Sequence, residues 1–155
     1  CVMTDRHVFT KTLTSLNIGQ PAFSVSMAGV QAIADNVVTK VIFDTELFDT
    51  SGNFDSTTNY RFTPTVAGYY LITFKGVWGN AVDADSFTLF IYKNGASYSA
   101  DYKQGAKSDA LSGNVTALVN FNGTTDYVEL RVSAVGSNLA LDGPKGWINA
   151  HYIGG

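Results

Sequence analysis

The chain has 155 residues, a length typical of one domain with a sizeable core. Its formal net charge is −3 and only 15% of its residues are charged, so nothing in the charge balance favours nucleic-acid binding. The longest apolar runs are far shorter than the roughly 20 residues that span a bilayer, and we expect no membrane insertion.

The only cysteine is Cys1, so no disulfide forms within one copy of the chain. The fold must therefore be stable through burial or through association, and the redox compartment is undetermined. A cysteine at this position fits the lipid-bearing first residue of a bacterial lipoprotein, or a processed or trimmed fragment. We favour the fragment.

Strand-like alternation begins at Ala22. Phe23, Val25 and Met27 alternate with small residues, which predicts a half-buried first strand. We expect a linker over residues 29–36 and then a second strand. The second strand should place these side chains on one face: Val37, Thr39, Val41 and Phe43. Residues 1–20 lack sustained periodicity, and we interpret them as an extended arm leading into one domain, residues 21–155.

A polar stretch separates Phe43 from Tyr60. Its Asp, Asn, Ser and Gly residues are turn formers whose side chains bond to their own backbone. Three isolated apolar residues, Leu47, Phe48 and Phe54, are expected to hold this long loop, or short strands within it, against the core.

The stretch YRFTPTVAGYYLITFKGVW, residues 60–78, predicts a turn followed by a long strand. Tyr70, Ile72 and Phe74 occupy alternate positions, so they should point into the core. On the reverse face, Tyr69 and Leu71 are too apolar for a freely solvated surface. This reverse face therefore predicts contact with another subunit.

Residues 86–93 predict a strand that is apolar on both faces, so both should be buried. One face carries Phe87, Leu89 and Ile91, and the other carries Phe90 and Tyr92. The pair Asn94-Gly95 readily adopts the positive φ angles of a tight hairpin turn. We expect residues 96–113 to contain a returning strand and an exposed loop.

The remaining chain predicts three more strands, over residues 114–121, 127–135 and 146–155. Turns are expected at Asn122-Gly123 and at Asp142-Gly143-Pro144. No amphipathic run is long enough for a helix. Short strands at regular spacing, punctuated by Gly and Asn, predict an all-β sandwich or jelly roll.

Several motifs in register resemble the globular head of complement C-one-q, a domain of the tumour necrosis factor superfamily. Residues 62–70 resemble its "Phe, Thr, Pro, two residues, Gly, Tyr, Tyr" element. The other matching positions are AFSV at Ala22 to Val25, Val41 to Phe43 with Phe54, the hairpin Lys93-Asn94-Gly95, and Tyr127, Val128 and Leu130 in a late strand. The resemblance covers residues 21–155.

The chain also departs from that family's pattern. The family's "Phe, Ser, Gly" near the end is here Ile148-Asn149-Ala150, and residues 1–20 contain no collagen-like glycine repeat. The Thr-, Ser- and Asn-rich style is similar to versions of this domain in bacteriophage structural proteins and bacterial surface proteins.

The resemblance implies a ten-stranded antiparallel jelly roll assembled as a three-fold homotrimer. The doubly apolar strands independently predict a partner, because a monomer would leave aromatic surface exposed. We expect the trimer interface to contain Tyr69, Leu71, Phe90, Tyr92 and His151.

Few residues suit catalysis, and we predict no enzyme. The chain has no Gly-rich phosphate loop, no nucleophile elbow and no Cys/His zinc set. We interpret His7 as solvated and His151 as structural. A glycan hydrolase would need two carboxylates across a cleft, and the sequence does not place its acidic residues that way. The acidic residues considered are Asp83, Asp85, Asp101 and Asp109.

Aromatic residues near loops are the better candidates for recognition, because sugars stack their C–H faces on rings and donate hydroxyl hydrogen bonds to Asp and Asn. The candidate ligand-binding residues are Trp78, Asn80, Asp83, Asp85, Tyr98 and Tyr102. We interpret the glycosylation sequons at Asn114 and Asn122 as structural.

Asp83 and Asp85, beside Asn80, offer oxygen ligands for Ca²⁺, and so does a second acidic run of Asp44, Asp49 and Asp55. Calcium occurs in the family that the chain resembles. Neither run has EF-hand spacing, so we favour turn residues and expect no cofactor.

We therefore predict a non-enzymatic trimeric structural and attachment module of a virion: a phage fibre, spike or capsid-decoration protein. The arm would anchor it to other virion proteins, and the outward loops would contact a cell-surface glycan or receptor. The alternative is a secreted or cell-surface receptor-binding ligand of the complement or tumour necrosis factor type.

Overall fold

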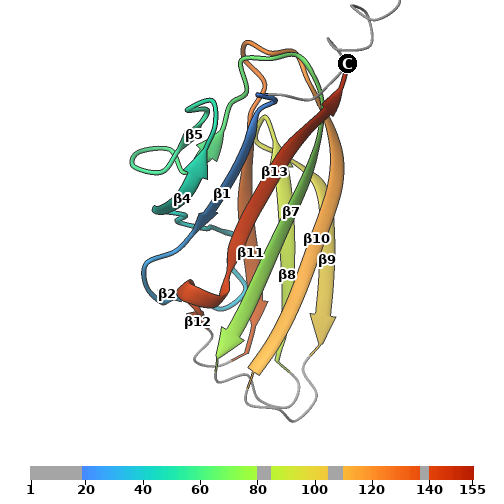
Figure 1. Ribbon diagram of the computed structural model, residues 1–155. Coiled ribbons are helices and arrows are strands. Elements are labelled where there is room, and N and C mark those ends of the chain that lie inside the picture. Colours follow the sequence, from blue (N-terminus) through green and yellow to red (C-terminus); the bar gives the residue numbers. More distant parts are fainter. Residues whose placement is uncertain (1–18, 80–84, 105–109, 137–139) are drawn as a thin grey trace, which may run out of the picture.

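The computed structural model describes residues 19–79, 85–104, 110–136 and 140–155 (Figure 1). The expected arm lies outside these residues, apart from Gly19 and Gln20. Thirteen strands and one 3₁₀ helix, η1 (Gly143–Lys145), make up the described elements. Eight strands have five or more residues and the other five have two each. The count is higher than the ten expected strands because the structure includes these two-residue strands. No described helix is long and apolar enough to cross a membrane.

Two antiparallel sheets pack face to face. Sheet A has the order β4, β1, β13, β7 and β10, with β12 pairing alongside the end of β7 and β2 pairing with β12. Its strands are β1 (Ala22–Ser26), β2 (Gln31–Ala32), β4 (Thr45–Asp49), β7 (Gly68–Gly79), β10 (Ala110–Phe121), β12 (Ala140–Leu141) and β13 (Trp147–Gly154). In Figure 1, β13, β7 and β10 lie in front of the second sheet.

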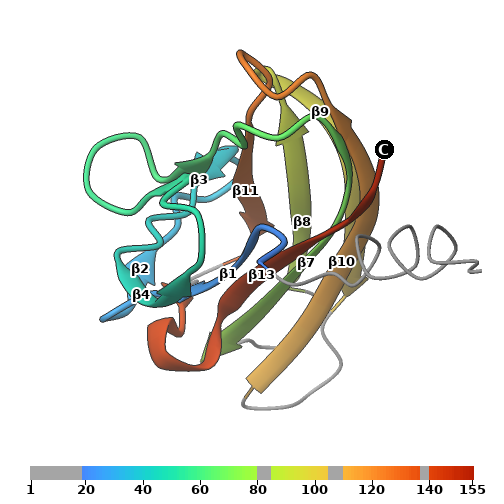
Figure 2. The same cartoon turned by 45° about the horizontal axis from the view of Figure 1, so that its top comes forward.

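Sheet B has the order β5, β6, β11, β8 and β9, with β3 also pairing with β11. Its strands are β3 (Thr39–Lys40), β5 (Phe54–Asp55), β6 (Arg61–Phe62), β8 (Ser86–Lys93), β9 (Ala96–Gln104) and β11 (Val128–Val135). Consecutive strands lie in different sheets at β2 and β3, β3 and β4, β4 and β5, β6 and β7, β7 and β8, β9 and β10, β10 and β11, and β11 and β12. Figure 2 shows β7 and β10 of sheet A in front of β8 and β11 of sheet B. The all-β jelly-roll prediction is therefore confirmed.

The core fills the space between the sheets, as the alternation in β7 predicted. Tyr70, Ile72 and Phe74 are all fully buried. The ring of Tyr70 meets Phe62 and Phe121 edge-on, at centroid distances of 5.4 and 5.3 Å. Its hydroxyl donates a hydrogen bond of 2.9 Å to the carbonyl oxygen of Val66. Burial, with a smaller contribution from Tyr152, raises the pKa of Tyr70 to about 12, so the phenol stays neutral at physiological pH.

The predicted turns are tied together by side-chain hydrogen bonds. Asn94 and Gly95 have φ angles of 52° and 82°, which suits a tight hairpin. Asn94 Oδ1 accepts a bond from the N–H of Tyr127, and its Nδ2 donates to Asp126. Asn122 caps the next hairpin, because its Oδ1 accepts from three successive backbone N–H groups that begin at Thr124.

Three expectations about residues 29–59 were wrong in part. The linker contains β2, and the second strand is limited to β3, with Val37 exposed while Val41 and Phe43 are buried. Phe54 holds its loop to the core, but Leu47 and Phe48 are 65% and 50% exposed. The physical reason is that β4 is an edge strand of sheet A and Phe48 pairs with Ser24 on the outer face.

Candidate functional site

The outer face of sheet A is built from aligned rungs of four strands. One rung joins Ala22, His151, Leu71 and Leu118 across β1, β13, β7 and β10. The next rung joins Ser24, Asn149, Thr73 and Thr116, in which the hydroxyl oxygens of the two threonines lie 3.1 Å apart. A third joins Ser26, Trp147, Lys75 and Asn114. Because side chains alternate along each strand, all these residues point away from the core.

One end of this face is apolar. Tyr69 and Leu118 are 47% and 49% exposed, and Ile153 at the end of β13 is 48% exposed. Leu71 lies between Leu118 and His151 in the same rung. We call Tyr69, Leu71, Leu118, His151 and Ile153 the apolar patch. The sequence predicted three of the five members, and the strand alternation of residues 114–121 was the signal for Leu118.

Charge is scarce on this face. Among the outward positions of β1, β7, β10 and β13 that the structure describes, Lys75 is the only one with a full charge at neutral pH. The other polar side chains there belong to Ser, Thr and Asn, which carry no charge, and to His151. A low density of charge next to exposed apolar side chains is typical of surfaces that become buried on association.

Two of the predicted interface residues lie on the opposite side of the sandwich. Phe90 and Tyr92 point outward from β8 in sheet B. Their rings contact each other edge-on at 5.8 Å, and the guanidinium of Arg131 lies 4.7 Å from the ring centre of Tyr92. Their partial burial therefore has an explanation within one chain and does not require a second subunit.

A buried carboxylate organises the outer face of sheet B. Glu129 is only 4% exposed and forms ion pairs with Lys40 and Arg131. Burial alone would raise the pKa of the Glu129 carboxyl, but the hydrogen bonds from Lys40 and Arg131 outweigh it and hold the pKa below its ordinary value. Strand alternation over residues 127–135 places Glu129 on the outer face but does not indicate that its carboxylate is buried.

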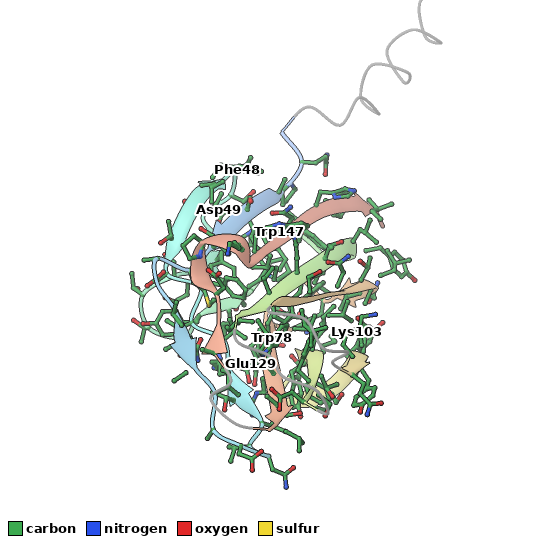
Figure 3. All side chains as sticks on the ribbon, turned by 90° about the horizontal axis from the view of Figure 1, so that it is seen from below. Phe48, Asp49, Trp78, Lys103, Glu129 and Trp147 are labelled. Atoms are coloured by element: carbon green, nitrogen blue, oxygen red, sulfur yellow. The ribbon has the colours of Figure 1, made fainter. Side chains whose placement is uncertain are left out.

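The candidate ligand residue Trp78 lies inside the protein. Its side chain has no exposed surface and stacks on Phe87 with ring centres 3.5 Å apart (Figure 3). Its ring therefore cannot stack on a sugar at the surface of this chain. The sequence reasoning failed because Trp78 stands next to a loop yet occupies a core position, with Gly76 leaving room for the indole.

The other ligand candidates do not form one cluster among the described residues. Asp85 is buried, with its carboxylate against Gly136, and both Asn80 and Asp83 lie outside the described residues. Tyr98 and Tyr102 are exposed on β9, at the edge of sheet B. The hydroxyl of Tyr98 donates to the carbonyl oxygen of Leu118 and so ties the edges of the two sheets together.

Two of the acidic residues considered for Ca²⁺, Asp49 and Asp55, are hydrogen-bonded within turns. Asp49 accepts bonds from three backbone N–H groups between Ser51 and Phe54. Asp55 accepts from Thr58, Thr57 and Asn59, and these bonds hold the pKa of its carboxyl well below the ordinary value. No group of three or more metal-binding side chains occurs in the described part of the chain. The expectation that the chain binds no cofactor stays a prediction, which a Ca²⁺ titration would test.

The fold is a jelly roll, similar to the folds of a complement C-one-q globular domain and a tumour necrosis factor protein. Three solved structures are similar over 86% of this chain. They are the globular domain of zebrafish complement 1qA (TM-score 0.63, 19% identity, 97% of that chain), murine APRIL (0.66, 10%, 99%) and the vertex protein P5 of phage PRD1 (0.62, 20%, 97%). Neither a protein-family model nor a curated protein matches the sequence.

Proposed function

We propose that the chain is a non-enzymatic, homotrimeric structural and attachment module of a virion. The observation that supports the trimer is the apolar patch at one end of the outer face of sheet A. Tyr69, Leu118 and Ile153 are each about half exposed in a single copy. A three-fold assembly removes such side chains from water without the hydration cost of burying charge.

The likeness to the PRD1 vertex protein supports the virion role, since it combines the fold with 20% identity over most of both chains. In this proposal, the arm of residues 1–20 anchors the trimer to a neighbouring virion protein. The surfaces away from the arm contact a receptor or glycan on the host cell. Three equivalent weak contacts then act together, which raises the overall affinity without a new type of contact.

The second candidate is a secreted receptor-binding ligand. The likeness to murine APRIL and zebrafish complement 1qA favours it, with the same 86% coverage of this chain. Genes for capsid or tail proteins beside the coding sequence would favour the virion module. A signal peptide encoded upstream would favour the secreted ligand.

Sedimentation velocity of the purified chain at micromolar concentration tests the trimer. We expect a single species of three times 16.6 kDa. A folded monomer under these conditions would overturn the proposal.

The variant Tyr69→Asp tests the face itself, because it places a charge in the apolar patch. We expect soluble monomers or unfolded protein, which circular dichroism distinguishes. An unaltered trimer would show that this face is not the interface.

A further inference from the structure

A shallow groove of about 300 Å³ lies on the outer face of sheet A, across β4, β1 and β13. It occupies the rungs of Asn149 and Trp147, so it adjoins the apolar patch along β13 but does not include it. Figure 3 shows Phe48 on β4 and Trp147 on β13, which both face this side. The groove is lined by Ser24, Ser26, Leu47, Pro144, Trp147 and Asn149.

The groove combines an aromatic ring with neutral hydrogen-bonding groups. Trp147 is partly exposed, and Leu47 and Pro144 add apolar surface beside it. Ser26 makes only a long hydrogen bond of 3.4 Å to the carbonyl oxygen of Thr45, so its hydroxyl is available for a stronger one. The amide oxygen of Asn149 is shielded and has no hydrogen-bond partner among the residues that the structure describes.

The groove is electrically neutral. None of its lining residues has an ionisable side chain. The adjacent Lys145 is paired with Asp142 at 2.7 Å. Lys75 is opposite Trp147 in the register but lies on β7, on the side of β13 away from β1. These surroundings favour an uncharged ligand over a phosphate, a sulfate or a carboxylate.

We infer that this groove binds one neutral pyranose ring, with the apolar C–H face of the sugar on Trp147 and its hydroxyls on Ser24, Ser26 and Asn149. The volume is at the lower end for small-molecule sites, which suits one sugar ring. A shallow site with one stacking ring gives weak affinity, roughly millimolar, for a free monosaccharide. The inference deepens the proposed attachment role by naming its site and ligand class.

The test follows the indole N–H signals of the two tryptophans by NMR during sugar titration of the full chain. The probes are methyl α-D-glucopyranoside, methyl α-D-mannopyranoside, methyl β-D-galactopyranoside and N-acetylglucosamine, with dextran as a neutral polymer in parallel. We expect at least one sugar to shift the Trp147 signal along a saturable curve while the buried Trp78 signal stays in place. A response to dextran alone would point to a surface polymer as the ligand source, and a response to the glycosides to a free sugar; both support the site.

Variants separate the groove from general effects. Because these variants lose the reporting indole, their binding is measured by saturation-transfer difference on the protons of the sugar. Trp147→Ala should weaken binding at least about tenfold, as expected for the loss of one stacking ring, and Trp147→Phe should keep part of the affinity. The matched control, Tyr102→Ala, removes an exposed ring from β9 and should leave binding unchanged. Equal binding by Trp147→Ala, or no shift of Trp147 with any probe, overturns the inference.

Sedimentation of the same samples keeps the two proposals distinct. If the protein is a trimer and the Trp147 signal never responds to a sugar, the proposed assembly stands and the proposed sugar site is wrong. If the protein is a monomer that binds sugar through Trp147, the proposed sugar site stands and the proposed trimer is wrong.

Discussion

Glu129 is a single residue whose environment the local sequence does not reveal. It stands at an outward position in β11, yet Lys40 and Arg131 cover its carboxylate. Lys40 comes from β3, about ninety positions earlier in the chain, and pairs in register with Arg131. Strand alternation gives the direction in which Glu129 points, and only the neighbouring strands determine that it is buried.

Replacing Glu129 by Gln should lower the free energy of unfolding by about 1–2 kcal/mol at pH 7, less than for a fully buried pair because Lys40 and Arg131 remain about one-third exposed. The pKa of Glu129 is lowered by folding, so its ion pairs stabilise the protein above the unfolded-state pKa and lose this effect as the pH falls through the lower, folded-state value. Urea unfolding should therefore show the difference at pH 7 and its disappearance in strongly acidic buffer. Glu46→Gln, at an exposed site, is the control, and an equal loss in both variants would contradict the assignment.

The two tryptophans differ in burial in a way that the local sequence does not reveal. Trp78 and Trp147 both lie in strands close to turns, and the sequence alone favoured Trp78 as the ligand residue. The structure buries Trp78 completely and leaves Trp147 partly exposed. The difference depends on which face of sheet A each ring occupies.

Among the elements, β7 organises the sandwich, because it lies between β13 and β10 and supplies core residues along its length. Its alternation, the turn before it and the hairpins at Asn94 and Asn122 were all predictable, since local propensities and burial agree there. The two-residue strands were not predictable, because they exist only where a distant strand offers hydrogen bonds.

Packing against Trp78 leaves no room for a side chain at Gly76 in β7. A Cβ atom there would lie 2.5 Å from the ring of Trp78, within the stack on Phe87. We expect Gly76→Ala to destabilise the protein by about 1–3 kcal/mol, the usual range for overpacking. Urea unfolding measures this loss, with Gly79→Ala as the control in the same strand because a Cβ there meets no atom within 4 Å. Equal stability of the two variants would show that the indole moves aside without cost.

For the whole molecule, the arrangement of the two sheets decides which apolar residues remain exposed. Leu118 and Val135 are both 49% exposed, but Leu118 belongs to the apolar patch on sheet A and Val135 points outward from the end of β11 in sheet B. This pair allows a matched comparison of the two faces.

Leu118→Asp should weaken self-association by at least about tenfold, since each interface loses an apolar contact and gains a buried charge. Val135→Asp should leave the assembly unchanged. Sedimentation velocity over a concentration series checks both variants. Dissociation caused by Val135→Asp, with Leu118→Asp still trimeric, would move the interface to sheet B.

The sequence by itself determined the fold class, the core face of each long strand and the hairpin turns, because side-chain alternation and turn chemistry act over a few residues. It also predicted an apolar face at Tyr69 and Leu71. The tertiary structure decided that Phe90 and Tyr92 lie on the opposite side from that face, that Trp78 is core, and that Trp147 borders a groove. These outcomes depend on which strands become neighbours, and contacts between residues far apart in the chain control that choice.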